Sequence, residues 1–374
     1  MSKLKIKDIT INLDNIRKPL NGIDREKISI KKLYPYCGAN NIMDYVDEYL
    51  FDEEILCIAE DGGKWGKNEK CSYIMNEKCW INNHAHVLKV NDNVDIRYLK
   101  YWFNYNDLNS IITGAIVRKL TQKALNNIEI NLPTKEEQIK IADKVDKIEN
   151  LIQLKRTQIE NLNELVKSQF VELFGDINLN DKVWNKDVLK NHLKVIGGYA
   201  FKSSEFQNTG IPVLRIGNIN AGYFRPKDLM FYNEDEKLKN YIIYPNDVVM
   251  SLTGTVGKDD YGNVCIMGDD FEKYYLNQRN AKLELKETLN KMYISYALRV
   301  PEIKKRLTGI SRGVRQANIS NKDIENLEIP IPPIEFQNQF AEFVKLIDKQ
   351  KFVIVEIIMF YDIILKSILN NIMG

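Results

Sequence analysis

Two stretches of this chain repeat each other and decide its fold. The first reads Lys123-Ala-Leu-Asn-Asn-Ile-Glu-Ile-Asn-Leu-Pro133-Thr-Lys-Glu-Glu-Gln138, and the second reads Lys322-Asp-Ile-Glu-Asn-Leu-Glu-Ile-Pro-Ile-Pro332-Pro-Ile-Glu-Phe-Gln337. Around them, residues 113–175 align with residues 312–374 without a gap. Positions identical in the two copies include Asn127, Glu129, Pro133, Gln138, Val145, Ile148 and Gly175. Such similarity indicates a duplicated unit, so we expect one chain with approximate two-fold symmetry.

Each copy ends in a long predicted helix. Pro133 precedes the first helix, acidic residues suit its positive end, and Gly175 ends it. Hydrophobic residues recur in steps of three and four, which is the spacing of a coiled-coil seam. The seam residues are Val145, Ile148, Ile152, Ile159, Leu162, Val166, Val344, Ile347, Ile354, Ile358, Tyr361 and Leu365.

Pairing of the two helices is the favoured arrangement. A helix of about 40 residues is roughly 60 Å long, far longer than one small core. A two-fold axis relating the copies would make the pair antiparallel. The alternative is two separate amphipathic helices, each lying on its own domain.

Short runs of β-like composition occupy the rest of both halves, for example residues 54–59, 86–90 and 247–252. A length of 374 residues also exceeds one ordinary core. We therefore predict an α+β fold with an internal repeat. Its segments are a first domain at 1–131, a central helix at 132–175, a second domain at 176–329 and a C-terminal helix at 330–374.

The second helix is apolar almost all round between residues 352 and 365. A coiled-coil seam needs only a stripe, so something else should cover the surplus. The chain's own domains and a partner protein are both open at this point.

The composition, 44% hydrophobic and 28% charged, is that of a soluble globular protein. A net charge of +2 disfavours a nonspecific polyanion binder, although it allows a local basic patch. The five cysteines form no C-x-x-C pair, and their odd number fits a reducing cytoplasm better than a disulfide framework. No signal peptide is expected, and charges interrupt the apolar stretch 352–373, so no membrane span is expected either.

Catalytic motifs fail on inspection. Residues 253–258 resemble a phosphate loop but lack its spacing. His84 and His86 alternate along a predicted strand, so their imidazoles should point apart, and no metal site is predicted. Residues 284–286 with 245–247 faintly resemble a nuclease set, which chance alone explains in a chain rich in Lys and Glu. The chain also has no G-x-S-x-G motif and no Gly-rich AdoMet loop. We expect a protein that binds and does not catalyse.

The order of these segments resembles a known family. A variable domain, a Leu-Pro-x-x-x-Glu-Gln helix at 132–138, a second variable domain and an Ile-Pro-x-Pro-Pro-x-x-x-Gln helix at 329–337 are similar to the specificity (S) subunits of type I restriction–modification systems. Supporting phrases are residues 34–40, 58–62, 198–203, 211–218 and 247–255.

The resemblance implies a non-catalytic subunit that reads DNA. Each variable domain would read one half of a split double-stranded target, and the helices would set the spacing. Two methyltransferase subunits would supply AdoMet and adenine-N6 methylation, and motor/nuclease subunits would bring ATP and Mg²⁺. This chain would bind no cofactor itself.

Residues that suit base and phosphate contacts gather in three segments of each half. Arg, Lys, Asn and Gln read base edges, and Lys, Ser and Thr contact phosphates. The candidates are Lys64, Trp65, Lys67, Asn68, Asn82, Asn83, His84, Arg118, Lys119, Thr121, Gln122, Thr253, Thr255, Lys258, Asn277, Gln278, Arg279, Arg312, Arg315, Gln316 and Asn318. Ordinary solvated loops and turn-forming asparagines would produce part of this pattern as well.

Two other classes of function stay open. The chain could be an enzyme, either a nuclease or a fused DNA methyltransferase, which AdoMet binding by the chain alone would indicate. It could also be a coiled-coil adaptor without a DNA role, which a sequence-selective gel shift would exclude.

Overall fold

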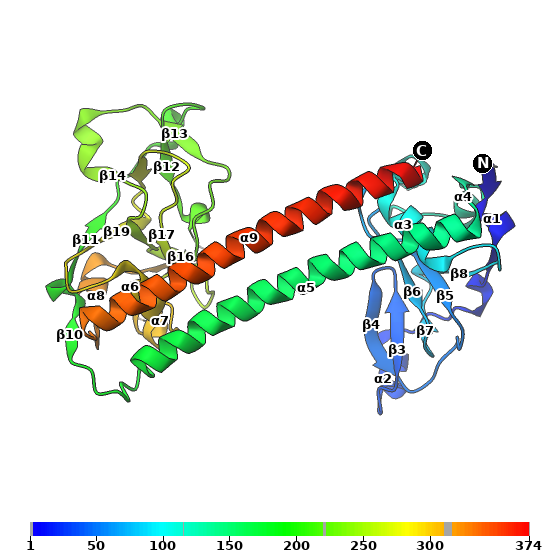
Figure 1. Cartoon of the computed structure of the whole chain (residues 1–374), viewed down its shortest axis with the longest axis horizontal. Coiled ribbons are helices and arrows are strands. Elements are labelled where there is room, and N and C mark those ends of the chain that lie inside the picture. The colour runs from blue at the N-terminus through cyan, green and yellow to red at the C-terminus, as the bar shows by residue number, and fades with distance from the viewer. Residues whose placement is uncertain (1–2, 115, 220–221, 310–315, 374) are drawn as a thin grey trace. The chain divides into compact units, whose positions relative to one another are not determined.

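The computed structural model describes residues 3–114, 116–219, 222–309 and 316–373, except for the side chains of 316 and 371–373. The contacts divide the chain into two compact units. Unit 1 comprises Met1–Thr157 and Ile354–Gly374, and unit 2 comprises Gln158–Val353. Each unit combines helices with short strands, which confirms the predicted α+β class (Figure 1).

Unit 1 contains two main sheets. The first is antiparallel, in the order β2 (Thr10–Asn12), β8 (Ala85–Val90), β5 (Ile55–Ala59), β6 (Ser72–Met75). The second has the order β4 (Asn41–Val46), β3 (Tyr34–Gly38), β7 (Trp80–Ile81), with β3 and β7 parallel. A third pairing joins β1 (Lys3–Lys5) to β9 (Glu129–Asn131). The helices are α1 (Ile6–Ile9), α2 (Gly22–Lys27), α3 (Ile96–Tyr105) and α4 (Gln122–Asn126), with 3-10 turns η1 (Asp14–Ile16) and η2 (Asn109–Ile111).

Unit 2 repeats this plan. Its antiparallel sheet has the order β11 (Leu193–Gly197), β19 (Asn280–Leu285), β15 (Val248–Ser251), β17 (Val264–Ile266). Its second sheet has the order β13 (Met230–Tyr232), β12 (Ile211–Leu214), β18 (Tyr274–Leu276), β14 (Ile242–Ile243), with β12 and β18 parallel. Smaller pairings join β10 (Lys186–Val188) to β21 (Glu328–Pro330) and β16 (Thr253–Thr255) to β20 (Gln316–Asn318). The helices are α6 (Lys291–Ala297), α7 (Pro301–Thr308) and α8 (Asn321–Glu325), and the 3-10 turns are η3 (Leu189–Asn191), η4 (Ser203–Glu205), η5 (Ile216–Asn218) and η6 (Glu236–Tyr241).

The matching strand orders confirm the internal repeat. Each unit closes with a strand pair, β1–β9 or β10–β21, that leads directly into a long helix. The central strands β5 and β15 are buried at every position, as expected for strands packed on both faces. The repeat therefore extends from the sequence to the hydrogen-bonded framework.

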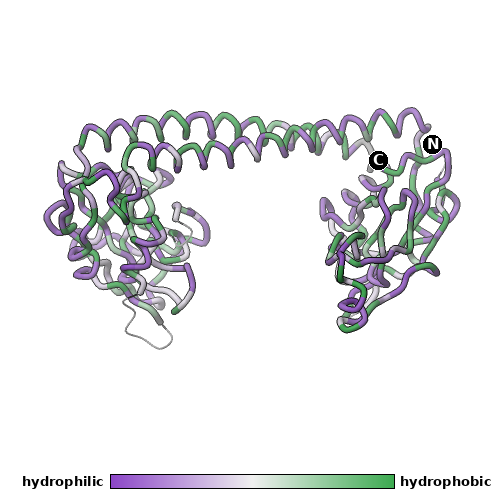
Figure 2. The backbone as a smooth tube through the Cα atoms, turned by 90° about the horizontal axis from the view of Figure 1, so that it is seen from below, coloured by the Kyte–Doolittle hydropathy of each residue, from purple (hydrophilic) through white to green (hydrophobic). Residues whose placement is uncertain are grey.

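The two long helices each contribute to both units. α5 runs over Lys135–Phe174 and α9 over Ile334–Met373, and each has 40 residues. Along both helices hydrophobic and hydrophilic residues alternate, as a buried stripe requires (Figure 2). Gly175 ends α5 with a φ of +72°, a conformation that favours glycine, as the sequence predicted.

The helix segments pair within each unit. In unit 1, Val145, Ile148 and Ile152 of α5 share one hydrophobic cluster with Leu365 and Leu369 of α9. Because this places the first half of α5 with the last half of α9, the two segments run antiparallel (Figure 1).

Unit 2 pairs the opposite halves of the helices, with aromatic residues in place of aliphatic ones. Phe170 and Phe174 of α5 pack on Phe340 of α9, with ring centroids 5.3 and 5.6 Å apart. Edge-on contacts at this distance add to the stabilisation from burial. Both pairings contradict the alternative in which each helix lies only on its own domain.

The predicted seam residues are buried or half-buried. Val145, Ile148, Ile152, Val166, Val344, Ile347, Ile354 and Leu365 are buried, and Ile159, Leu162, Ile358 and Tyr361 are half-buried. The assignment of these twelve residues to a coiled-coil seam stays a prediction, and all of them are at least partly buried. The four-segment division into domains stays a prediction, because the contact-based units each include part of both helices.

A buried glutamine connects each long helix to its domain. Gln138 is fully buried and its amide oxygen accepts the backbone N–H of Asp95 (2.8 Å). Its amide nitrogen donates to the backbone carbonyls of Asn93 (3.1 Å) and Pro133 (2.9 Å). Asp95 is the N-cap of α3, so this one side chain links the start of α3 to the start of α5.

The second copy contains the same three bonds. Gln337 is also fully buried, accepts the N–H of Asn290 (2.8 Å) and donates to the carbonyls of Thr288 (3.1 Å) and Pro332 (2.7 Å). Asn290 is the N-cap of α6. We call Gln138 and Gln337, with these bonds, the glutamine clasps.

Large apolar side chains of α9 stay exposed in unit 1. Val355, Met359, Phe360 and Ile363 have exposed fractions of 44%, 60%, 59% and 65%. The chain's own domains do not cover these side chains. Among the described residues, no helix has the length and apolar character that crossing a membrane requires.

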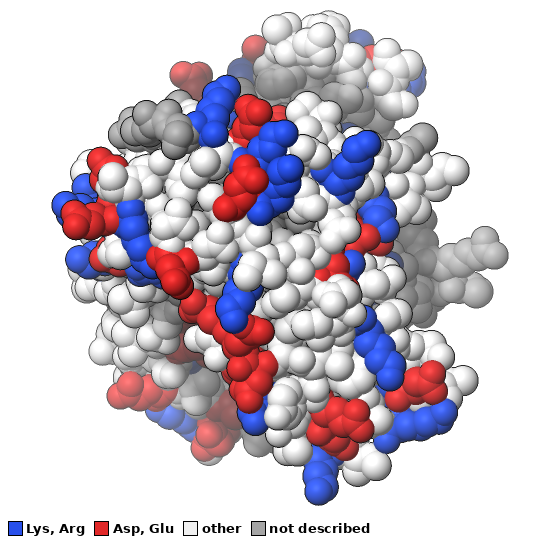
Figure 3. All heavy atoms as spheres, turned by 90° about the vertical axis from the view of Figure 1, so that its right-hand side faces the viewer, with Lys and Arg blue, Asp and Glu red and all other residues white. Residues whose placement is uncertain are grey.

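Charges of both signs are mixed on the surface. On the face drawn in Figure 3, basic and acidic side chains lie close to one another. This agrees with the near-neutral total charge. This face is therefore not a field of a single sign.

We expect the glutamine clasp to be a main determinant of stability. Replacing Gln337 with Ala leaves one backbone N–H and two backbone carbonyls without this partner, and the Pro332 carbonyl is buried, so the free energy of unfolding should fall by about 2–4 kcal/mol. The control is Gln339→Ala, an exposed position of the same helix, where a change below about 0.5 kcal/mol is expected. Urea denaturation followed by tryptophan fluorescence measures both. Equal losses for the two variants would contradict this role.

Candidate nucleic-acid interface

One turn occurs at equivalent places in both units, after the parallel strand of the second sheet. In unit 1 it consists of Asn82, Asn83 and His84, between β7 and β8. The Asn82 side-chain oxygen accepts the backbone N–H of His84 (2.8 Å), and the Asn82 backbone N–H donates to the carbonyl of Cys37 (3.0 Å). An asparagine that bonds the backbone two residues onward forms an Asx turn, which holds the loop in one conformation.

Unit 2 has the same turn at Asn277, Gln278 and Arg279, between β18 and β19. The Asn277 side-chain oxygen accepts the N–H of Arg279 (3.2 Å), and the Asn277 N–H donates to the carbonyl of Leu214 (3.4 Å). We call residues 82–84 and 277–279 the paired turns.

In unit 1 the paired turn joins the two other predicted segments. The N–H of Glu60, just after β5, donates to the carbonyl of His84 (2.9 Å). The N–H of Leu120 donates in turn to the carbonyl of Glu60 (2.8 Å), and Asp61 forms a β-bridge with Lys119. Three segments distant in sequence therefore lie side by side.

Unit 2 uses the same bonds. The N–H of Leu252 donates to the carbonyl of Arg279 (2.8 Å), and the N–H of Ile319 donates to the carbonyl of Leu252 (2.9 Å). Beside them, Thr253 pairs with Asn318 in the β16–β20 ladder. The structure thus brings predicted residues from all three segments together.

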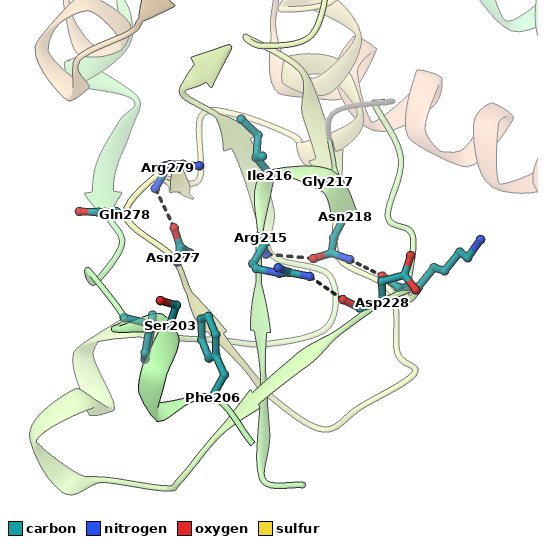
Figure 4. A pocket seen from close by; sticks show the side chains of 12 residues that line it. Ser203, Phe206, Arg215, Ile216, Gly217, Asn218, Asp228, Asn277, Gln278 and Arg279 are labelled. Carbon is teal, nitrogen blue, oxygen red and sulfur yellow. Dashed lines mark hydrogen bonds between the residues drawn. The ribbon is translucent and has the colours of Figure 1, made fainter. Parts of the chain in front are cut away.

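Two hollows adjoin the paired turn of unit 2. One, of about 300 Å³, is lined by Thr253, Gln278, Arg279 and Asn318, all of them predicted contacts. The other, of about 470 Å³, contains Gln278 and Arg279 in its lining and is shown in Figure 4. Gln278 and Arg279 point in different directions from the turn (Figure 4).

The larger hollow is lined by residues that sequence reasoning missed. These are Phe201, Ser203, Phe206, Arg215, Ile216, Gly217, Asn218, Lys227 and Asp228. Arg215 donates to the Asp228 carbonyl (2.7 Å), and the buried Asn218 accepts the Arg215 N–H (3.0 Å). The available signal was the two phrases 198–203 and 211–218, which supported the resemblance but were not considered as a site.

The remaining predicted residues of unit 1 differ in exposure. Lys64, Lys67, Asn68, Asn83, His84, Arg118 and Gln122 are exposed, and Lys119 and Thr121 are half-buried. Five of these side chains have partners within the chain. Lys119 pairs with Glu60 (2.6 Å), Thr121 caps α4, Arg118 donates to Asn109 (2.5 Å), His84 bonds Asp61 (2.6 Å) and Gln122 donates to Asn12 (2.8 Å). Their part in binding stays a prediction.

Two predicted contacts of unit 1 are wrong. Trp65 is 2% exposed, and its indole N–H donates to the carbonyl of Ala59 (3.2 Å), so its ring belongs to the core. Asn82 is 3% exposed, and its side chain is used inside the Asx turn. Both side chains are therefore buried supports of the loops and are not available to contact DNA.

In unit 2, Thr255, Lys258, Gln278, Arg279 and Asn318 are exposed, and Thr253 and Asn277 are half-buried. Thr255 donates its hydroxyl to Asp260 (2.9 Å), which stabilises the loop after β16. Arg312, Arg315 and the side chain of Gln316 lie outside the described residues.

A buried charged cluster lies behind the paired turn of unit 1. His86 bonds Asp14 (2.6 Å) through Nδ1 and the Leu120 carbonyl (2.7 Å) through Nε2. Arg17 contacts both Glu60 (2.6 Å) and Asp14 (3.3 Å). Burial raises the pKa of both carboxyls, but bonds to His86 at Asp14 and to Lys119 and Arg17 at Glu60 outweigh it, so both pKa values are lowered.

This cluster does not suit a metal ion. Asp14, Glu60 and His86 lie close enough to share one, with ligand atoms within 4.8 Å of one another. However, both carboxylates already form ion pairs. Arg17 contacts Asp14 and Glu60, and the ammonium group of Lys119 lies 2.6 Å from Glu60. His84 lies in the turn before β8 and bonds Asp61 (2.6 Å), so the two imidazoles have different partners.

Two members of the nuclease-like set have structural partners. Asp247 pairs with Lys282 (2.9 Å), and Lys286 donates to the carbonyl of Asn191 (2.9 Å).

Comparison with known proteins gives a consistent result. The family model described as "Type I restriction modification DNA specificity domain" matches residues 3–164 and 182–356. The specificity subunit of the type I restriction enzyme MjaVIII from Methanocaldococcus jannaschii is 27% identical over 89% of this chain and 82% of its own length. A putative type I specificity subunit from Haemophilus influenzae, S.HindORF215P, is 25% identical over 90% of this chain and 84% of its own length.

Solved structures share the fold. The crystal structure of the type I restriction–modification S subunit from M. genitalium aligns with 98% of this chain and 94% of its own, with a TM-score of 0.62 and 14% identity. Because the family model matches most of the chain in two consecutive blocks, one for each copy of the repeat, the chain belongs to the family of type I restriction–modification DNA specificity subunits.

Proposed function

We propose that this chain reads a bipartite double-stranded DNA target for a type I restriction–modification complex. The observation that carries the proposal is the paired turns, which present exposed Asn83 and His84 in unit 1 and Gln278 and Arg279 in unit 2 on the same hydrogen-bonded framework. Asn, Gln and Arg side chains can each form two hydrogen bonds to the edge of one base. Two such turns in one chain suit a target with two half-sites.

The long helices would set the distance between the half-sites. A 40-residue helix is about 60 Å long, which corresponds to roughly 17 base pairs at 3.4 Å each. Pairing of α5 with α9 inside each unit supports a stiff connection between the recognition domains proposed at 1–131 and 176–329.

Other subunits would supply the chemistry. The exposed apolar side chains of α9 in unit 1, among them Phe360 and Ile363, suit docking of a protein partner. We propose two methyltransferase subunits that carry AdoMet, with motor/nuclease subunits that use ATP and Mg²⁺, while this chain catalyses no step.

We propose the cytoplasm as its location. All five cysteines are free and buried, and burial raises the pKa of the Cys37 and Cys265 thiols to about 12. Thiols kept protonated in this way are unreactive, which suits a reducing compartment.

Mapping of methylated adenines in the host genome tests the function. We expect a two-part motif with an unspecified gap in cells that contain this gene and its methyltransferase, and loss of that motif when this gene alone is deleted. The purified chain alone should bind no AdoMet. Persistence of the motif after deletion, or tight AdoMet binding by the chain, would instead favour the enzyme alternative.

Lengthening the helices tests the spacing. Seven residues inserted after Thr157 in α5 and seven after Val353 in α9 keep the heptad phase and add about 10 Å, or roughly three base pairs. The methylated motif should keep both half-sites and gain that gap. A matched control inserts the heptad in α5 alone, which should disrupt helix pairing and abolish methylation. An unchanged gap in the double insertion would contradict the proposal that helix length sets the distance between the half-sites.

A further inference from the structure

The paired turn of unit 2 has a fixed backbone. In addition to the Asx bond, the N–H of Gln278 donates to the carbonyl of Tyr199 (2.9 Å), and the carbonyl of Arg279 accepts the N–H of Leu252 (2.8 Å). Tyr199 also forms a parallel β-bridge with Asn277. Because the backbone of the turn is already fixed by hydrogen bonds, binding of a ligand by its side chains costs little backbone conformational entropy.

The Arg279 guanidinium, in contrast, has no partner within the part of the chain that the structure describes. It is exposed, and only its backbone is bonded. Three other cations of unit 2 are paired with carboxylates: Lys282 with Asp247 (2.9 Å), Lys273 with Glu234 (2.5 Å) and Lys304 with Asp259. Arg279 thus has a fixed backbone and a guanidinium whose five N–H groups are available to a ligand.

The equivalent residue in unit 1 differs. The carbonyl bonds of the two turns make His84 the counterpart of Arg279, and His84 is engaged by Asp61 (2.6 Å). The amide residues do correspond, because Asn83 and Gln278 are both exposed at the middle of the turn. The two reading positions therefore share a scaffold and differ in one key side chain.

We infer that Arg279 is a specificity-determining residue that reads a guanine in the half-site bound by unit 2. The inference rests on the proposed function and adds base identity to it. A guanidinium donates two parallel hydrogen bonds to O6 and N7 of guanine in the major groove, a pattern that no other base presents. The two hollows beside Arg279 leave space for its side chain to move toward a base edge. In unit 1 the equivalent turn position is occupied by His84, so no guanidinium reads that half-site from this position.

Methylation mapping in cells that carry the complete complex tests the inference. With Arg279→Ala, one G·C position in one half-site should become degenerate, and the other half-site should stay unchanged. Asn83→Ala should alter only the half-site that Arg279→Ala leaves intact. The matched control is Arg306→Ala, an exposed arginine of α7 whose guanidinium bonds the Glu328 carbonyl (2.8 Å), and the motif should not change.

A binding measurement covers the case in which Arg279→Ala abolishes methylation altogether. Purified chain with its methyltransferase subunits is titrated with duplexes in which the guanines of one half-site are replaced singly by 7-deazaguanine. At one position, loss of N7 should weaken binding of the unaltered protein about tenfold or more, and should have no further effect on Arg279→Ala. Thermal unfolding of the variant should match that of the unaltered protein, because Arg279 is exposed.

The possible results distinguish guanine reading by Arg279 from the proposed DNA recognition by the whole chain. If the motif keeps every guanine in Arg279→Ala, or if 7-deazaguanine weakens both proteins equally, Arg279 does not read a guanine although the chain still reads DNA. If the unaltered complex methylates no bipartite motif, the proposed function itself is wrong.

Discussion

Both copies of this fold depend on one fully buried amide. In each, the glutamine five residues after a proline of the motif, Pro133 or Pro332, bonds the N-cap residue of a domain helix and two backbone carbonyls, one of them at the entry to the long helix. An amide is suited to this place because it offers an acceptor and two donors at once, and all three are used. A carboxylate would lack the donors, and an apolar side chain would leave three backbone groups without this partner. The orientation of each long helix on its own domain therefore depends on Gln138 and Gln337.

The same division between constant scaffold and variable side chain appears at the paired turns. Asn82 and Asn277 each fold their turn by bonding the backbone two residues onward, and the next strand begins at once. The side chains at the following positions are then free to differ, from Asn83 and His84 in one unit to Gln278 and Arg279 in the other. Changes at these exposed positions leave the core untouched, so recognition can vary while the fold stays the same.

Much of the fold was predictable because it follows periodicity and repetition. The seam of α5 and α9 was predictable from the hydrophobic spacing, and the end of α5 from Gly175. The candidate site was predictable only in part. Trp65 was predicted as a DNA contact because it belongs to the segment 64–68, but its indole N–H donates to the Ala59 carbonyl and its ring lies in the core. Arg215 and Phe206 were missed because they reach the hollow from β12 and from the loop after η4, far in sequence from the paired turn.

The sequence by itself determined that the chain is a duplication with two long heptad helices, since identity at matched positions and spacing along a helix are one-dimensional properties. Only the tertiary structure decided which polar side chains are available. Asn82 and Asn83 are adjacent and chemically the same, yet one is 3% exposed and the other is exposed. Their difference arises from bonds to Cys37 and His84 and from the packing around them. Contacts of this kind join residues remote in the chain, and a local sequence pattern does not encode them.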